Sequence, residues 1–299
     1  MENYLVLDIG GTAIKFAIAD KEANFKEKGS IKTYPDSFEK QIEEIGKTYD
    51  ELKKRYLIKG IAISSPGFVD GVKGITYGAS ALPCIMEKEI ARAIHLRMDG
   101  LPISMENDGN CGGLGEYWKG RGRGKKNIVM LVCGSGIGGG YVREGKIDRT
   151  IHHASAEFGF MPMVFEEGKV KSWSSCSVVN ILKKYLQEVP SSISGKELFD
   201  LAEKDNVAKK YVDKFYYHLA LGCISVGFAL DPDLIIIGGA ISKRRDFETN
   251  IREQIRKIKS SNFEFSCNKT DIAVAELGND ANLYGALYNF LYVRQCEVI

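Results

Sequence analysis

The residues best suited to bind phosphate lie in a short glycine-rich stretch near the start of the chain. It reads Asp8-Ile9-Gly10-Gly11-Thr12-Ala13-Ile14-Lys15 and lies between the apolar runs 4–7 and 16–19. A Gly-Gly turn between two such runs predicts a β-hairpin. Glycine backbone can approach a phosphate closely, Thr12 and Lys15 can donate hydrogen bonds to it, and Asp8 can hold a hydrated magnesium ion. A glycine-rich hairpin with a capping Asp explains the same residues equally well.

A second stretch of the same kind, Gly134 to Gly140, follows the strand pattern 128–132. Its glycines satisfy G-x-G-x-x-G, the dinucleotide-binding motif, which requires a helix after the loop. Here Tyr141-Val142-Arg143 and the turn Glu144-Gly145-Lys146 follow instead, which predicts a second hairpin. The place of Glu157, near the spacing of a ribose-binding acid, is then a coincidence. There is also no Walker-type G-x-x-x-x-G-K-[ST] sequence.

Three further segments carry polar groups, and the first two of them follow predicted strands. They are Ser65-Pro66-Gly67-Phe68-Val69-Asp70, Glu106-Asn107-Asp108-Gly109-Asn110 and Ala156-Glu157-Phe158-Gly159. Asp108 follows a strand and could accept a proton from a substrate hydroxyl. From the local sequence alone, capping of the next helix is the better explanation for Asp108.

Taken in order, the two hairpins, these segments and the run Asp231-Pro232 with Leu234-Ile235-Ile236-Ile237-Gly238-Gly239 resemble the ROK family of sugar kinases (repressor, open reading frame, kinase). The resemblance extends from Asp8 to Leu287. It implies an α/β fold of the actin-like ATPase type (ribonuclease H-like, hexokinase-type), with duplicated domains and a cleft between them. Some members of the family are repressors with a DNA-binding extension, which we do not expect here because only seven residues precede Asp8.

The resemblance also implies a role for each matching residue. Asp108 becomes the catalytic base, and the sugar is bound by Gly67, Asn107, Asp108 and Glu157. The phosphates and adenosine of ATP are bound by Asp8, Gly10, Gly11, Thr12, Lys15, Gly134, Ser135, Gly136, Gly238 and Gly239. Mg²⁺ is held by Asp8 through water. The implied protein is a homodimeric kinase that phosphorylates a hexose, at the 6-hydroxyl, with β-glucoside kinase, glucokinase and N-acylmannosamine kinase as alternatives. A non-catalytic sugar-binding or sensing protein of the same fold is the alternative from another class.

Three departures from the family pattern bear on the sugar and on a structural zinc. Phe160 stands where many relatives have a zinc-binding His, and in the region that follows only Cys176 remains of a Cys cluster. We therefore predict no zinc, with Trp173 and Phe160 filling the space, and treat His152 and His153 as surface residues. No acid is present near Ser174 or Ser175, and Ala81 replaces an Asn before Leu82-Pro83. A sequence without these residues resembles the β-glucoside kinase branch of the family.

Composition limits the class of protein. The 299 residues are 44% hydrophobic and 27% charged, with a net charge of +2, which predicts a globular enzyme with no strong field for nucleic acid or membrane. The basic run from Lys119 to Lys126 is interpreted as a solvated loop. Seven scattered cysteines, with no C-x-x-C pair, and the lack of a signal peptide or long apolar run predict a cytoplasmic location.

Local patterns predict the elements that position these residues. The expected strands are 3–9, 13–19, 25–33, 61–63, 102–105, 128–132, 234–237 and 271–275. The expected helices are 38–56 with a capping box at Asp36 and Glu39, 85–98, 110–118, 207–230, 243–258, and 280–294 capped by Asp280. We expect one domain from 1–109 with 280–299 and a second from 110–279.

Overall fold

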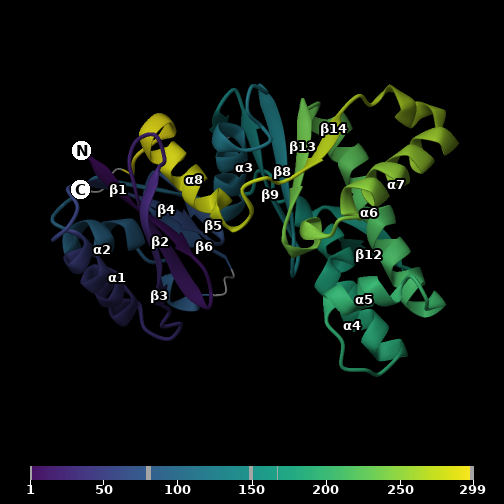
Figure 1. Cartoon of the computed structure of the whole chain (residues 1–299), viewed down its shortest axis with the longest axis horizontal. Coiled ribbons are helices and arrows are strands. Elements are labelled where there is room, and N and C mark those ends of the chain that lie inside the picture. Colours follow the sequence, from purple (N-terminus) through teal and green to yellow (C-terminus); the bar gives the residue numbers. More distant parts are fainter. Residues whose placement is uncertain (1, 79–81, 148–150, 167, 297–299) are drawn as a thin grey trace. The chain divides into compact units, whose positions relative to one another are not determined.

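The computed structural model describes residues 2–78, 82–147, 151–166 and 168–296. The chain separates into two compact units (Figure 1). The first unit comprises Met1–Arg123, Val142–Ser155 and Asn279–Ile299, and the second comprises Gly124–Tyr141 and Ala156–Gly278. The domain boundaries expected from the sequence stay a prediction. Within the described residues, no helix has both the length and the apolar character that crossing a bilayer demands.

A five-stranded sheet forms the framework of the first unit. Its order is β3-β2-β1-β4-β7. The hairpin strands pair antiparallel, whereas β1, β4 and β7 run parallel, so the last three strands end at the same edge. The strands are β1 (Asn3–Ile9), β2 (Ala13–Ala19), β3 (Phe25–Lys32), β4 (Ile58–Ser65) and β7 (Ile103–Asn107).

Both faces of this sheet are buried, because successive side chains of a strand point to opposite sides. Leu5 and Leu7 belong to the core that includes residues of α1 (Phe38–Leu52) and α2 (Ile90–Arg97). Val6 belongs to the opposite core, which includes residues of α8 (Ala281–Tyr288). The near-continuous apolar runs of the parallel strands follow from this burial on two sides.

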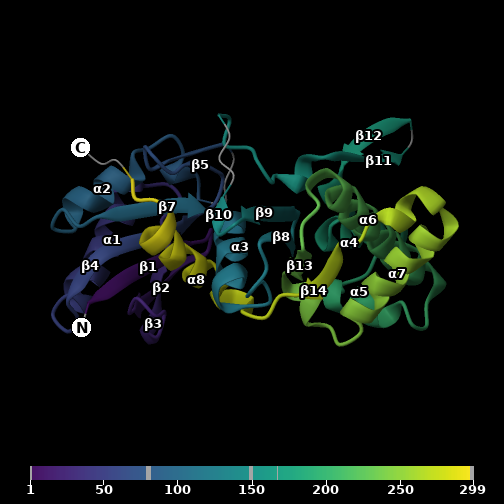
Figure 2. The same cartoon turned by 90° about the horizontal axis from the view of Figure 1, so that it is seen from above.

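Helix α3 (Asp108–Lys119) packs directly along α8, and Figure 2 shows the two helices side by side. Glycine allows the close approach. A Cβ atom at Gly285 would lie 1.7 Å from the Cys111 carbonyl oxygen, and one at Gly115 would lie 2.1 Å from that of Ala281. The last helix of the chain therefore completes the first unit.

A second five-stranded sheet repeats the strand order of the first. It runs β10-β9-β8-β13-β14, with β8, β13 and β14 parallel. Strands β8, β13 and β14, and β9 up to Tyr141, belong to the second unit. A single apolar core joins the sheet to four helices. The strands are β8 (Asn127–Cys133), β9 (Ile137–Arg143), β10 (Lys146–Ile147), β13 (Leu234–Gly238) and β14 (Asp271–Val274), and the helices are α4 (Val178–Glu188), α5 (Gly195–Leu201), α6 (Asn206–Leu230) and α7 (Phe247–Ser261).

Short elements complete the two units. The small strands are β5 (Phe68–Asp70), β6 (Ile75–Tyr77), β11 (Pro162–Glu166) and β12 (Lys169–Ser172). The 3₁₀ turns are η1 (Pro83–Ile85), η2 (Phe158–Phe160), η3 (Trp173–Cys176), η4 (Ala240–Lys243), η5 (Phe263–Cys267) and η6 (Gly278–Asp280), and η7 (Asn289–Val293) is a π turn.

Several predicted helix ends are wrong. The helix expected over 85–98 begins only at Ile90, since Glu87 has a φ of 56°, which a right-handed helix does not allow. Ser37, and not Asp36, caps α1, because its side chain accepts the Lys40 backbone N–H. Asp280 stands at the N-cap position of α8 but makes no capping bond; it pairs with Lys28 at 2.8 Å.

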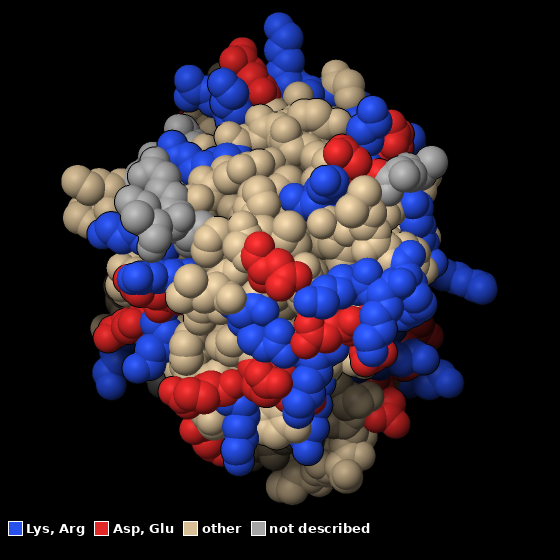
Figure 3. Space-filling model, turned by 90° about the vertical axis from the view of Figure 1, so that its left-hand side faces the viewer, with Lys and Arg blue, Asp and Glu red and all other residues tan. Residues whose placement is uncertain are grey.

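Acidic and basic side chains alternate on the surface around α1. Arg97 pairs with Glu43 and Asp50, Lys53 pairs with Asp50 and Asp99, and Arg55 pairs with Glu27. In Figure 3, which views the molecule from the left-hand side of Figure 1, blue and red atoms intermix across the lower half of the face. Charges on this face therefore largely compensate one another, in agreement with the small net charge.

Candidate functional site

The first glycine stretch is the turn of the β1–β2 hairpin, as predicted. Asp8 and Lys15 are opposite each other in the antiparallel register, and their carboxylate and ammonium groups lie 3.3 Å apart. The Gly10 N–H donates to the Ala13 carbonyl at 3.2 Å, which closes the turn. Thr12 is exposed at its tip. The hairpin thus brings together a buried carboxylate, a half-exposed ammonium group and the exposed Thr12 of the turn.

Two residues that the sequence interpretation missed hold the Asp8 carboxylate. The Ser64 hydroxyl donates to Oδ1 at 2.9 Å from the end of β4, and the Asn282 amide donates to the same atom at 3.0 Å from α8. Ser64 could have been suspected from its position at the end of a buried strand. No local pattern indicates Asn282, which is 274 residues away along the chain.

Asp108 stands where β7 ends and α3 begins, and it does not cap the helix. That role belongs to Asn107, whose side chain accepts the Asn110 N–H at 3.1 Å. Asp108 Oδ1 accepts the Gly109 N–H at 2.8 Å and the Asn107 amide at 3.1 Å. Helix capping, which the local sequence favours for Asp108, is therefore wrong for that residue, and the cap is Asn107.

The environment of Asp108 favours its protonated form. Burial raises the pKa of the Asp108 carboxyl, and the nearby negative charge of Asp8 raises it further. The Gly109 N–H and the Asn107 amide oppose the shift by stabilising the carboxylate. A carboxylate with a raised pKa is a better proton acceptor than an ordinary aspartate.

Gly67 is tied to the same group of residues. Its carbonyl accepts the Asn107 amide at 2.9 Å. Its φ of 90° and a Cβ position only 2.8 Å from the Tyr77 carbonyl oxygen explain why glycine is needed. Glu106, which precedes Asn107, is buried and accepts the Asn110 amide at 3.0 Å. The structure thus gathers Asp8, Gly67, Asn107 and Asp108 at the carboxyl edge of the first sheet.

The second glycine stretch joins β8 to β9, and no helix follows it, as predicted. The Gly134 N–H donates to the Gly136 carbonyl at 2.9 Å. Two serines from a distant segment hold this loop: Ser174 Oγ accepts the Ile137 N–H at 2.9 Å, and Ser177 Oγ donates to the Ser135 carbonyl at 2.8 Å. The loop itself carries no charged side chain between Cys133 and Gly140.

Glu157 lies immediately before the turn η2, in the second unit. This turn packs against the second glycine loop through Gly159, where a Cβ atom would be 1.9 Å from the Ile137 carbonyl oxygen and 2.4 Å from Ser174 Oγ. The predicted sugar-binding segment and the predicted phosphate loop are therefore neighbours within one unit.

Gly238 and Gly239 end β13 and begin the turn η4. Gly239 has a φ of 98°, and a Cβ atom there would lie 2.1 Å from the Cys133 carbonyl oxygen. Ser242 Oγ donates to the Gly239 carbonyl at 2.8 Å and closes the turn. This turn and the second glycine loop thus leave neighbouring strands at the same edge of the second sheet.

The region expected to replace the zinc site differs from the prediction. Trp173 is fully buried and packs on Gly222 of α6, whereas Phe160 is 69% exposed. Phe160 therefore does not fill an interior space, because η2 directs it outward. Ala81, the third departure, lies outside the described residues.

A cluster of charged side chains joins the β11–β12 hairpin, which precedes Trp173, to α4 and α6. Glu166 of β11 accepts the ammonium groups of Lys171 and Lys184, each at 2.9 Å, and that of Lys214. These bonds, from Lys214, Lys184 and Lys171 in order of effect, hold the pKa of the Glu166 carboxyl well below its usual range. The cluster fastens the β11–β12 hairpin to α4 and α6.

Potential metal ligands are sparse. In the part of the chain that the structure describes, no group of three or more His, Cys, Asp or Glu side chains is arranged to hold a metal ion. His153 lies 3.7 Å from Asp70, and Cys176 is buried. The Asp8 carboxylate is a hard oxygen donor that fits Mg²⁺ bound through water. The absence of zinc stays a prediction.

Comparison with known proteins gives a consistent result. The β-glucoside kinase of Listeria innocua is 28% identical over 95% of this chain and 96% of its own. The glucokinase of Halalkalibacterium halodurans is 27% identical over 94% and 93%. A ROK family protein from Streptococcus pneumoniae, solved in complex with sucrose, superposes with a TM-score of 0.87 at 29% identity and covers 97% of this chain and 98% of its own.

The family model itself decides the classification. The model of the ROK family matches residues 4–292. The predicted actin-like ATPase fold is confirmed by these relatives and by the two mixed sheets of the same strand order. The chain belongs to the ROK family.

Proposed function

We propose that the protein is an ATP-dependent sugar kinase that transfers the γ-phosphoryl group to a hexose hydroxyl, at the 6-position. The observation that carries the proposal is Asp108, a carboxylate of raised pKa that does not serve as the helix cap and lies near Asp8 of the first glycine hairpin. Both residues stand at the carboxyl edge of parallel strands, where ligands of α/β sheets bind.

In the proposed reaction Asp108 acts as the general base. Its carboxylate accepts the proton of the sugar hydroxyl while that oxygen forms a bond to the γ-phosphorus. The bond between the γ-phosphorus and the oxygen that bridges it to the β-phosphorus breaks, and ADP leaves with the electron pair. Asn107 and Gly67 orient the sugar in the first unit, and Glu157 accepts hydrogen bonds from sugar hydroxyls.

The phosphates have two sets of donors in this proposal. Lys15 and Thr12 supply donors at the first hairpin, and the backbone N–H groups near Ser135 supply them at the second. Gly238 and Gly239 shape the adenosine pocket. Asp8 would hold Mg²⁺ through water, and a bound Mg²⁺ would neutralise charge on the phosphates.

We infer that the acceptor is a β-glucoside. Similarity to the β-glucoside kinase of Listeria innocua supports this, together with the absence of an acid at Ser174 and Ser175. Ser174 is already engaged by the Ile137 N–H, and a contact to O1 that is absent cannot penalise a substituted O1. Because Trp173 is buried, Phe160 is the aromatic residue near Glu157 that offers an exposed apolar face to an aglycone.

An ADP-release assay with purified protein tests the proposal. ATP, Mg²⁺ and a panel of cellobiose, glucose and N-acetylmannosamine are compared in parallel by kcat/KM. We expect turnover with at least one sugar, and cellobiose to be at least as good a substrate as glucose. Turnover of glucose or N-acetylmannosamine without turnover of cellobiose would support the kinase activity and refute the preference for a glycoside.

The same assay separates the kinase from a non-catalytic sugar-binding protein of the same fold. Sugar binding by calorimetry without ADP release for any member of the panel would favour the sensor. The cytoplasmic location and the homodimer stay predictions; size-exclusion chromatography with light scattering checks the latter.

A further inference from the structure

Arg244 connects two elements of the second unit next to the Gly238–Gly239 turn. It follows η4 and stands five residues after Gly239. Its Nε and Nη2 atoms donate to the two carboxylate oxygens of Asp246 at 3.1 and 3.2 Å, and Nη1 donates to Asp200 of α5 at 2.5 Å. Its guanidinium also lies 5.6 Å from the centre of the Phe199 ring. The side chain is 15% exposed.

Hydrogen bonds hold the turn side of this connection. Ser242 Oγ donates to the Gly239 carbonyl, and the Arg244 N–H donates to the Ile241 carbonyl at 3.1 Å. The Phe247 N–H donates to the Arg244 carbonyl at 3.2 Å at the start of α7. The backbone from Gly239 to Phe247 is thus a chain of short-range hydrogen bonds, and the guanidinium projects from it toward α5.

The helix on the other side depends on its neighbours. α5 has only seven residues, too few to be stable as an isolated helix. Phe199 anchors it through edge-to-face contacts with Phe215 and Tyr216 of α6. Arg244 supplies its charged contact toward α7, through Asp200.

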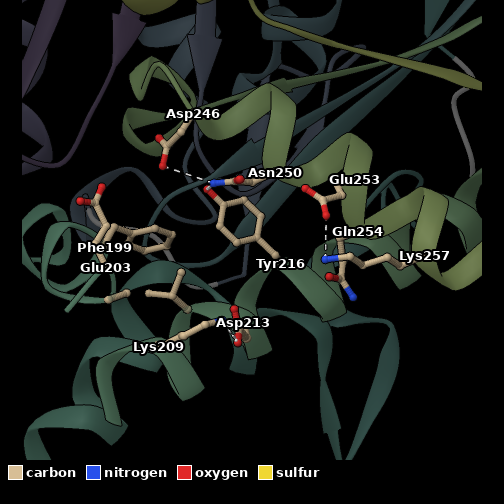
Figure 4. A pocket seen from close by; sticks show the side chains of 12 residues that line it. Phe199, Glu203, Lys209, Asp213, Tyr216, Asp246, Asn250, Glu253, Gln254 and Lys257 are labelled. Carbon is tan, nitrogen blue, oxygen red and sulfur yellow. Dashed lines mark hydrogen bonds and ion pairs between the residues drawn. The ribbon is translucent and has the colours of Figure 1, made fainter. Parts of the chain in front are cut away.

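The space beside this contact is hollow. Phe199 and Asp246 line a pocket of about 270 Å³ between α5, α6 and α7, and Figure 4 shows Tyr216 and Asn250 on its wall. A hollow provides fewer dispersion contacts between its walls than a filled core does. The placement of α5 relative to α7 therefore relies on the Arg244 contact more than it would in a close-packed interface.

We propose that Arg244 is a positioning residue for ATP: through Asp200 it ties α5 to the segment that follows the Gly238–Gly239 turn, and so maintains the nucleoside-binding shape of the second unit. This rests on the proposed nucleotide role of that turn. Arg244 itself contacts Asp200, Asp246 and Phe199, so its loss affects nucleotide affinity rather than the proton transfer at Asp108.

The test compares Arg244→Gln and Arg244→Lys with Arg252→Gln. Arg252 is a matched control, because it lies on α7 and bonds two carboxylates, those of Glu248 and Asp271, away from α5. KM for ATP, KM for sugar and kcat are measured separately, together with binding of a fluorescent ADP analogue and thermal stability.

We expect Arg244→Gln to raise KM for ATP and the Kd of the ADP analogue about tenfold, since it loses a bidentate charged contact. KM for sugar and kcat at saturating ATP stay within about twofold. Arg244→Lys, which keeps the charge but not the fork, gives an intermediate value. Arg252→Gln leaves nucleotide affinity unchanged.

Nucleotide affinity unchanged in Arg244→Gln, or weakened equally in Arg252→Gln, overturns the proposal, as does a fall in kcat without a change in affinity for ATP. If Arg244→Gln does not fold, Arg244→Lys decides by the same criteria. A wild-type protein that neither releases ADP nor binds the analogue refutes the proposed function instead.

Discussion

The two glycine hairpins stand at equivalent places in two sheets of the same strand order, yet different contacts hold them. In the first hairpin the charged pair Asp8 and Lys15 lies within the hairpin itself, opposite in register. In the second, Ser174 and Ser177 reach in from another segment, and the loop carries no charge. A repeated topology therefore specifies where a loop lies and leaves its chemistry free.

The two hairpins therefore have different roles in the proposed reaction. The carboxylates and the ammonium of the proposed site belong to the carboxyl edge of the first sheet, where charge must be moved or neutralised. The second hairpin offers backbone N–H groups, whose direction depends on the serines that hold the loop. Substitutions in the first unit should thus affect turnover, and those in the second should affect stability and nucleotide affinity.

The largest effect is expected from Asp108→Asn. The amide keeps the size of the side chain but cannot accept the proton, so kcat should fall by ~10²-fold or more, with sugar binding largely kept. Single-turnover kinetics and sugar calorimetry measure the two quantities. Near-normal turnover would contradict the base role.

The wild-type enzyme should also show the raised pKa of Asp108 as a pH effect. Because burial raises this pKa, the base becomes protonated at a higher pH than an ordinary aspartate, whose pKa is about 3.9. Activity should therefore fall, as pH is lowered, before that value is reached. A kcat profile that stays flat to the ordinary value would show that Asp108 does not control the rate.

Lys15→Gln should come next in size. It removes one charge-assisted contact to phosphate and the ammonium group paired with Asp8, so kcat/KM for ATP should fall about 10-fold or more. Lys21→Gln, on an exposed lysine beyond β2, is the control. Equal kcat/KM values for the two variants would show that Lys15 does not contact ATP.

Glu166→Gln should lower stability rather than turnover. It leaves Lys171, Lys184 and Lys214 close together without their shared carboxylate, and we expect a loss of about 1–3 kcal/mol in the free energy of unfolding. Glu188→Gln, at a more exposed acid paired with Lys210, is the control. Equal urea midpoints would show that the cluster does not stabilise the hairpin.

The same carboxylate predicts the direction of a pH effect on stability. The folded pKa of Glu166 is depressed, so its contribution is fully present above the unfolded pKa of about 4.3. That contribution is lost as pH falls through the folded value, and Glu166→Gln should lack this part of the acid dependence. Identical acid unfolding curves for the wild type and Glu166→Gln would contradict this prediction.

Ser174→Ala tests the second hairpin, and its effect on activity should be smaller than that of Lys15→Gln in the first hairpin. The Ile137 N–H loses its acceptor, so the free energy of unfolding should fall by about 1–3 kcal/mol and KM for ATP should rise a few-fold. Ser175→Ala is the matched control, because its buried hydroxyl has no oxygen or nitrogen hydrogen-bond partner among the described residues. A larger loss of unfolding free energy in Ser175→Ala than in Ser174→Ala would show that Ser174 is not the residue that stabilises the second hairpin.

Local patterns predicted the elements well and their ends less well. The β1–β2 hairpin, the Asn206–Leu230 helix and the β13 strand follow from apolar periodicity and from glycine at the turns. The start of α2 was misplaced because the left-handed Glu87 follows from the packing of its turn and not from its residue type. Likewise, both Asn107 and Asp108 suit an N-cap, and only the backbone conformation decides between them.

By itself, the sequence determined the strand and helix content, the two glycine loops, and the family to which their order belongs, because these depend on short-range spacing. Only the tertiary structure decided which groups share an environment. Asn282 reaches Asp8 from α8, burial and then the charge of Asp8 raise the pKa of Asp108, and Arg244 joins α5 to the residue before α7. These contacts join residues far apart in the chain, and their energies depend on distance and burial in space, which no local pattern encodes.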